Sequence, residues 1–141
     1  MTTKLAAAIS ALVALPLFGA VVVSRVEIRR VSLLGYRVGD VVLSREEAID
    51  ALAGMLDRIR AEAEDLVMAL RCARIEGRLH LRPMVTGSGP RVEIAPTITS
   101  GDIHTLAADR ALALGIVTRV LRDAGLDAQR DLFRGVVVVT A

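Results

Sequence analysis

The stretch SREEAIDALAGMLDRIRAEAEDLVMAL, residues 44–70, carries the clearest structural signal of the chain. Its first four residues form a capping box, in which the Ser44 hydroxyl accepts from the amide of Glu47 while the Glu47 side chain reaches back. Apolar residues then recur every three or four positions: Ile49, Leu52, Leu56, Ile59, Ala63, Leu66 and Leu70. This spacing predicts one long helix with a continuous apolar stripe.

The stripe has two interpretations. It can be the seam of a coiled coil that makes an oligomer, or it can cover a sheet within its own domain, which is the commoner arrangement. Under the first interpretation, or through the exposed side of the same helix, we expect a contact surface for a protein partner or a second copy. The candidate interaction residues are Ile49, Leu52, Leu56, Ile59, Leu66 and Leu70.

Upstream lies LAAAISALVALPLFGAVVV, residues 5–23, a run without a charged side chain. As one helix at about 1.5 Å per residue it would span roughly 28 Å, close to the ~30 Å hydrocarbon core of a bilayer. We therefore predict a single-pass transmembrane anchor over residues 1–24, with membrane lipid contacting residues 5–23. Arginines outnumber lysine around the run (Lys4 before it; Arg25, Arg29, Arg30 and Arg37 after it), which places residues 25–141 at the cytoplasmic face of the cell inner membrane.

Two alternatives remain open for this run. A cleaved signal peptide fits the basic start at Lys4, although the residues before a cut at Ala20 are poor. In the other alternative, a helix up to Pro16 and a strand from Ala20 to Val31 pack in a soluble core, because the β-branched residues 21–23 favour a strand.

The rest of the chain predicts a single α+β domain, residues 25–141. Strands are expected at Val26–Leu34 and Val136–Val139, and a turn at residues 35–40. Alternating apolar residues on both sides of residues 86–90 predict a β-hairpin, and a second helix is expected from residue 100 to about Leu121. The order β-α-β-β-α-β predicts a two-layer sandwich, with helices on one face of a mainly antiparallel sheet.

Composition excludes several classes of function. Aromatic residues make up 2% of the chain, which counts against stacking on nucleic acid or sugar, and the net charge is only +2. We expect no nucleic-acid partner. Seventeen of the 18 basic residues are arginine, as codon bias in a high-GC genome would produce. The single cysteine, Cys72, permits no internal disulfide and is interpreted as core filling.

Residues that could carry chemistry are few. The Gly87–Gly89 segment could cradle an anion, but it lacks a following helix and a lysine, so a plain hairpin turn is expected. Asp102 and His104, with Ser100, suggest a catalytic group, and His80 with His104, Glu76 or Asp102 suggests a metal site, but neither spacing is typical of such sites. We predict no enzyme, no metal and no cofactor.

Four segments resemble the alkaline shock protein family and its membrane-anchor relatives: Arg91–Ile94, Ser100–Ile103, the helix ending at Leu121–Leu126, and the final strand Val136–Val139. The resemblance covers about 50 residues and implies a small, non-enzymatic domain of Gram-positive bacteria associated with envelope stress. The start of the domain, Val26–Gly35 and the capped helix, also resembles the polypeptide-transport-associated domain of cell-division proteins, which works outside the membrane.

The sequence therefore predicts a non-enzymatic, membrane-anchored scaffold or assembly domain facing the cytoplasm. The alternative is a soluble structural subunit of a large particle such as a phage, whose apolar N-terminus packs on neighbouring subunits.

Overall fold

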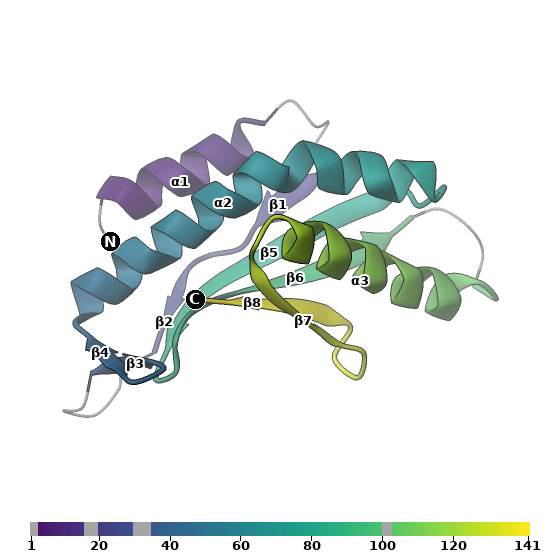
Figure 1. Ribbon diagram of the computed structural model, residues 1–141. Helices are drawn as coiled ribbons and strands as arrows, with labels where there is room; N and C mark the ends of the chain where they lie inside the picture. Colours follow the sequence, from purple (N-terminus) through teal and green to yellow (C-terminus); the bar gives the residue numbers. More distant parts are fainter. Residues whose placement is uncertain (1–2, 16–19, 30–34, 100–102) are drawn as a thin grey trace.

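The computed structural model describes residues 3–15, 20–29, 35–99 and 103–141. These ranges hold three helices and eight strands (Figure 1): α1 (Thr3–Val13), β1 (Val21–Val23), β2 (Glu27–Ile28), β3 (Tyr36–Val38), β4 (Val41–Leu43), α2 (Arg45–Cys72), β5 (Gly77–Thr86), β6 (Gly89–Ile98), α3 (Leu106–Asp123), β7 (Asp127–Asp131) and β8 (Val136–Thr140). The prediction of the α+β class is confirmed.

The main sheet has the strand order β1-β5-β6-β8-β7, and β2 also pairs with β5 further along that strand. β1 and β2 run parallel to β5, whereas the β5–β6, β6–β8 and β7–β8 pairs are antiparallel. β3 and β4 form a separate two-stranded sheet. The β5–β6 hairpin turns at residues 87–88, as the sequence predicts.

All three helices lie on one side of the main sheet (Figure 1). α2 packs on β5 and β6, α3 packs on β6, β7 and β8, and α1 packs on α2 and β1. The core between the layers is built from leucine, isoleucine, valine and alanine, because alternate strand residues such as Leu81, Ile94 and Val137 point to the helices. The other side of the sheet is free of helices within the described ranges.

The capping box at the start of α2 is confirmed. The Ser44 hydroxyl accepts from the Glu47 amide at 3.2 Å, and the Ser44 amide donates to the Glu47 carboxylate at 3.1 Å. The hydrogen bond from the Ser44 amide, together with the Ser44 side chain, favours the charged carboxylate and holds the pKa of Glu47 below its ordinary value. The stripe that follows is buried against the sheet and the neighbouring helices.

The predicted transmembrane anchor is wrong. α1 is an 11-residue helix, and none of the helices in the described ranges is both long and apolar enough to cross a bilayer. Leu5, Ala8 and Leu12 are buried in the same core as α2, and Val21–Val23 form an edge strand of the sheet. This matches the alternative in which a helix and a strand from residues 5–23 pack in the core of the domain. The predicted boundary at residue 24 therefore does not divide the core. The cytoplasmic orientation therefore loses its basis, since it depended on a spanning helix.

Three further boundaries differ from the prediction. The expected turn at residues 35–40 contains β3, which pairs with β4. The expected strand Val26–Leu34 is seen as β2 alone, and its residues 30–34 lie outside the described residues. α3 begins at Leu106, and the expected start at Ser100–Asp102 also lies outside them. The polar strand β7 was not predicted, so the order β-α-β-β-α-β is incomplete.

The packing of α1 predicts a large effect on stability for one substitution and a small effect for its neighbour. Leu12 is 1% exposed and Val13 is 62% exposed. We expect Leu12→Ala to lower the free energy of unfolding by about 2–5 kcal/mol, because it removes buried methyl groups and leaves a cavity. The control Val13→Ala is expected to change it by less than about 0.5 kcal/mol. Urea denaturation measures both, and equal small effects would show that α1 does not pack on the domain.

Candidate functional site

The helix-free face of the sheet carries the most organised polar cluster of the described residues. Glu93, in the middle of β6, lies opposite Arg82 on β5 and Val138 on β8. Arg91 stands two residues away on the same strand and therefore on the same face. Arg134, from the turn between β7 and β8, reaches across β8 to the same carboxylate. We call Arg82, Arg91, Glu93 and Arg134 the Glu93 cluster.

The geometry of the Glu93 cluster is that of a central carboxylate held by three guanidinium groups. Arg134 binds both oxygens of Glu93 in a bidentate pair, with both N–O distances at 2.7 Å. Arg91 contacts the carboxylate at 3.2 Å and Arg82 at 3.7 Å. Arg82 also pairs with Glu27 of β2 at 3.1 Å, so the cluster ties β2, β5, β6 and the β7–β8 turn together.

Burial and charge act in opposite directions on Glu93. Its side chain is 5% exposed, whereas those of Arg82 and Arg134 are 47% and 45% exposed. The hydrogen bonds from Arg134 hold the pKa of Glu93 below its ordinary value, although burial alone would raise it. Glu93 is therefore ionised at neutral pH, and the three arginines over it present guanidinium groups to solvent. Within the described residues, the Nε of Arg91 is buried without a hydrogen-bond partner.

The β7–β8 turn, residues 131–135, is fixed at both ends. The amide of Arg134 donates to the Asp131 carboxylate at 3.0 Å, and the amide of Gly135 donates to the Asp131 carbonyl at 2.9 Å. Gly135 has a φ of 68°, a left-handed conformation that a glycine adopts without strain. At the tip, Leu132 is 61% exposed and Phe133 is 100% exposed.

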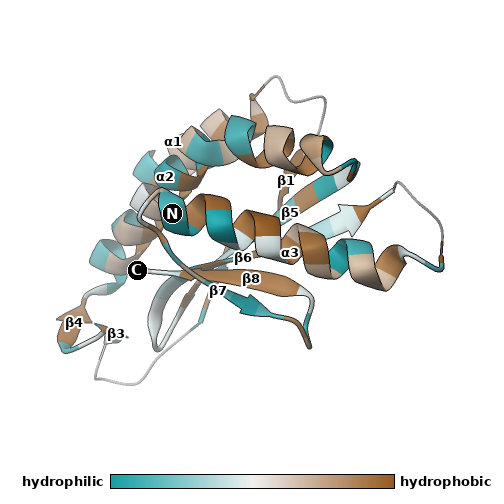
Figure 2. Ribbon diagram, turned by 45° about the vertical axis from the view of Figure 1, so that its right-hand side comes forward, coloured by the Kyte–Doolittle hydropathy of each residue, from teal (hydrophilic) through white to brown (hydrophobic). Residues whose placement is uncertain are grey.

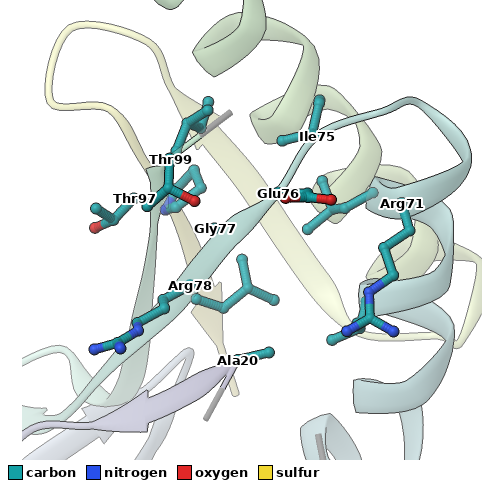
Figure 3. A pocket seen from close by; sticks show the side chains of 13 residues that line it. Ala20, Arg71, Ile75, Glu76, Gly77, Arg78, Thr97 and Thr99 are labelled. Carbon is teal, nitrogen blue, oxygen red and sulfur yellow. The ribbon is translucent and has the colours of Figure 1, made fainter. Parts of the chain in front are cut away.

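A pocket of about 460 Å³ lies where α2 ends and β5 begins (Figure 3). Its walls come from α2, β5 and the end of β6 and are polar and apolar in about equal parts, with Arg71, Glu76 and Arg78 among the lining residues. Gly77, which lines the pocket, has no room for a side chain, because a Cβ there would collide with the Thr97 carbonyl oxygen. The volume is in the range of small-ligand pockets. Ala20 and Thr99 of the lining directly border residues outside the described ranges.

A second, shallower groove runs between α2 and α3. It is lined mostly by small and apolar residues, with Arg119 and Arg130 at its margin. Cys72 lines this groove and is exposed, so the interpretation of Cys72 as core filling is wrong. The error has a simple source, since Cys72 follows the last stripe residue, Leu70, by two positions and so faces away from the core.

The residues predicted to contact a partner lie inside the domain. Ile49, Leu52, Leu56, Ile59, Leu66 and Leu70 are each 9% exposed or less and pack in the core cluster. The apolar stripe of α2 therefore covers the sheet of its own domain, which is the second of the two interpretations. The side of α2 that remains at the surface carries Asp57, Arg58, Glu64 and Asp65.

The histidine hypotheses gain no support from the described residues. His80 lies within β5, opposite Val22 and Ala95, whereas His104 precedes α3 and is exposed. No group of three potential metal-binding side chains occurs in the part of the chain that the structure describes. Ser100 and Asp102 lie outside that part. The Gly87–Gly89 segment is a hairpin turn, where the Gly87 carbonyl accepts from the Arg37 amide at 3.1 Å.

Comparison of the chain with protein-family models, curated proteins and solved structures finds no match. The resemblance to the alkaline shock protein family therefore stays a prediction.

The Glu93 cluster predicts a pH-dependent loss of stability on substitution. We expect Glu93→Gln to lower the free energy of unfolding at neutral pH by about 2 kcal/mol, because charge-assisted hydrogen bonds are lost. Since the pKa of Glu93 is lowered in the folded protein, its stabilisation is present above the ordinary value of 4.5 and is lost as the pH falls through the folded pKa. The gap between wild type and variant should therefore close in acid.

Urea denaturation along a pH series measures this gap. The matched control is Glu64→Gln, which changes an exposed carboxylate on α2. A Glu93→Gln effect that is the same at every pH would contradict the ionic role of the cluster.

Proposed function

We propose that the protein is a non-enzymatic assembly domain that docks a protein partner on the helix-free face of its sheet. The observation that carries the proposal is the Glu93 cluster, a buried carboxylate covered by three arginines that are still partly open to solvent. The helices use the apolar side of the sheet for the core, and the opposite side is left with an ordered, charged surface.

The charge of this surface indicates an acidic partner. The ion pairs on the helix-free face join four arginines (Arg29, Arg82, Arg91 and Arg134) to two glutamates (Glu27 and Glu93). The connected set therefore has an excess of two positive charges. Guanidinium groups already held by a carboxylate lose little side-chain entropy when they bind a second one, which favours recognition of carboxylate side chains.

The resemblance to the alkaline shock protein family also supports a non-enzymatic role. The proposed function includes no membrane-spanning anchor, because α1 packs within the domain.

Site-specific photo-cross-linking tests the proposal. A photoreactive phenylalanine analogue replaces Thr97, which is exposed on β6 four residues along from Glu93 and on the same face. The matched control replaces Asp57, which is exposed on α2. In the cells that make the protein, we expect discrete adducts from position 97 and none of the same mass from position 57.

A second variant ties the adducts to the arginines. Arg82→Gln with Arg91→Gln should reduce the adducts from position 97 several-fold, because charge-assisted contacts to the partner are lost. The same adducts from positions 57 and 97, or none from 97, would contradict the proposal. An adduct of twice the chain's mass with the purified protein would identify the partner as a second copy.

A further inference from the structure

The tip of the β7–β8 turn is the most exposed apolar feature of the described residues. The chain has only three aromatic residues, and one of them, Phe133, is 100% exposed beside Leu132, which is 61% exposed. Burying such side chains normally stabilises a protein, so two exposed apolar side chains at one tip form a candidate contact surface.

The tip cannot fold back to hide these side chains. Asp131 holds the turn through two hydrogen bonds, and Arg134, directly after Phe133, is locked onto Glu93 by the bidentate pair. The Glu93 cluster thus fixes the turn and holds Leu132 and Phe133 away from the sheet. In Figure 2 the turn projects beyond the end of the sheet, past the ends of the polar strand β7 and the apolar strand β8.

Two cationic side chains lie at the base of the tip. Arg134, directly after Phe133, is 45% exposed in spite of its ion pair. The side chain of Arg110 on α3 passes the same turn, since a Cβ at Gly135 would lie 3.5 Å from its Cδ. Between residues 130 and 135 the only acidic side chain is Asp131, and its carboxylate accepts from the turn.

We propose that this tip inserts into an anionic lipid bilayer, with Leu132 and Phe133 below the headgroups and Arg110 and Arg134 at the headgroup level. An apolar tip with cations at its base is the arrangement by which proteins attach to a membrane surface without crossing it. Anionic lipid complements the charge, because each arginine near such a surface is attracted to it.

The size of the tip favours lipid over a protein partner. An aromatic side chain buries roughly 150–250 Å², whereas a stable protein interface needs about 800 Å² on each partner. Two side chains on one turn offer well under that area. A bilayer is fluid, so insertion of the tip does not require a binding surface of complementary shape.

The absence of tryptophan from the chain provides a clean reporter. Phe133→Trp places a single indole at the tip, and Val41→Trp is the control, since Val41 is 59% exposed at the turn of the separate β3–β4 sheet. Both positions are exposed, so neither change is expected to alter the thermal unfolding midpoint. The probe is tryptophan emission on titration with vesicles of phosphatidylcholine alone or with an equal part of phosphatidylglycerol.

We expect a blue shift from the tip reporter with the phosphatidylglycerol vesicles and none from the Val41→Trp control. In co-sedimentation with the same vesicles, Phe133→Ser should weaken partitioning roughly tenfold or more, because the buried ring is lost. Arg110→Gln, which leaves the Glu93 cluster intact, should weaken partitioning by about fivefold.

Three results would overturn the proposal. They are no shift with either vesicle, equal shifts at both reporter positions, and a shift that grows with protein concentration without lipid. The last would assign the tip to a contact between copies. None of these outcomes tests whether a partner docks on the helix-free face, because that is measured by photo-cross-linking from position 97.

Discussion

The burial of the α2 stripe is the interaction on which the rest of the fold depends. α2 contacts α1 on one side, α3 on the other, and β5 and β6 beneath it. Leu52, Leu56 and Ile59 in its centre are at most 1% exposed. Because one helix supplies the shared contact, the N-terminal helix and the C-terminal β7–β8 hairpin belong to one core although they lie at opposite ends of the chain. This one-sided core leaves the other face of the sheet to polar contacts.

That other face is stabilised by a different kind of interaction. Glu93 replaces the apolar side chain that a second helical layer would require, and its charge is compensated by arginines from a neighbouring strand, from its own strand and from the β7–β8 turn. A carboxylate buried without them would be strongly destabilising. The cluster thus links the stability of the sheet to the position of the Leu132–Phe133 tip, and the two proposed surfaces share one structural support.

Local signals in the sequence predicted the elements that depend on local contacts. The capping box at Ser44 and the β5–β6 hairpin involve residues close together in the chain, and both are confirmed. The anchor prediction failed because it counted apolar residues in the run and not their spacing. Leu5, Ala8 and Leu12 recur at three and four positions, which is the pattern of a helix with one buried face.

The candidate site could not be predicted in the same way. Glu93 and Arg134 are 41 positions apart, and their contact depends on β8 lying between β6 and β7. The alternation of β6 did place Glu93 on the face opposite the core, but no pattern in the sequence shows that an arginine covers it. β7 was missed because only Ala128 of its five residues is buried.

The position of β1 and β2 has a consequence for how the N-terminal segment can be removed. These short strands occupy the outer edge of β5, at Leu79–Leu81 and at Met84–Val85. β5 is ten residues long, and without its parallel neighbours it would present a row of unpaired amides and carbonyls. A chain shortened to residues 25–141 would lose both β1 and the helix α1, which packs on α2. The exposed edge of β5 would then pair with other chains and promote aggregation. The N-terminal segment therefore protects the edge of the sheet.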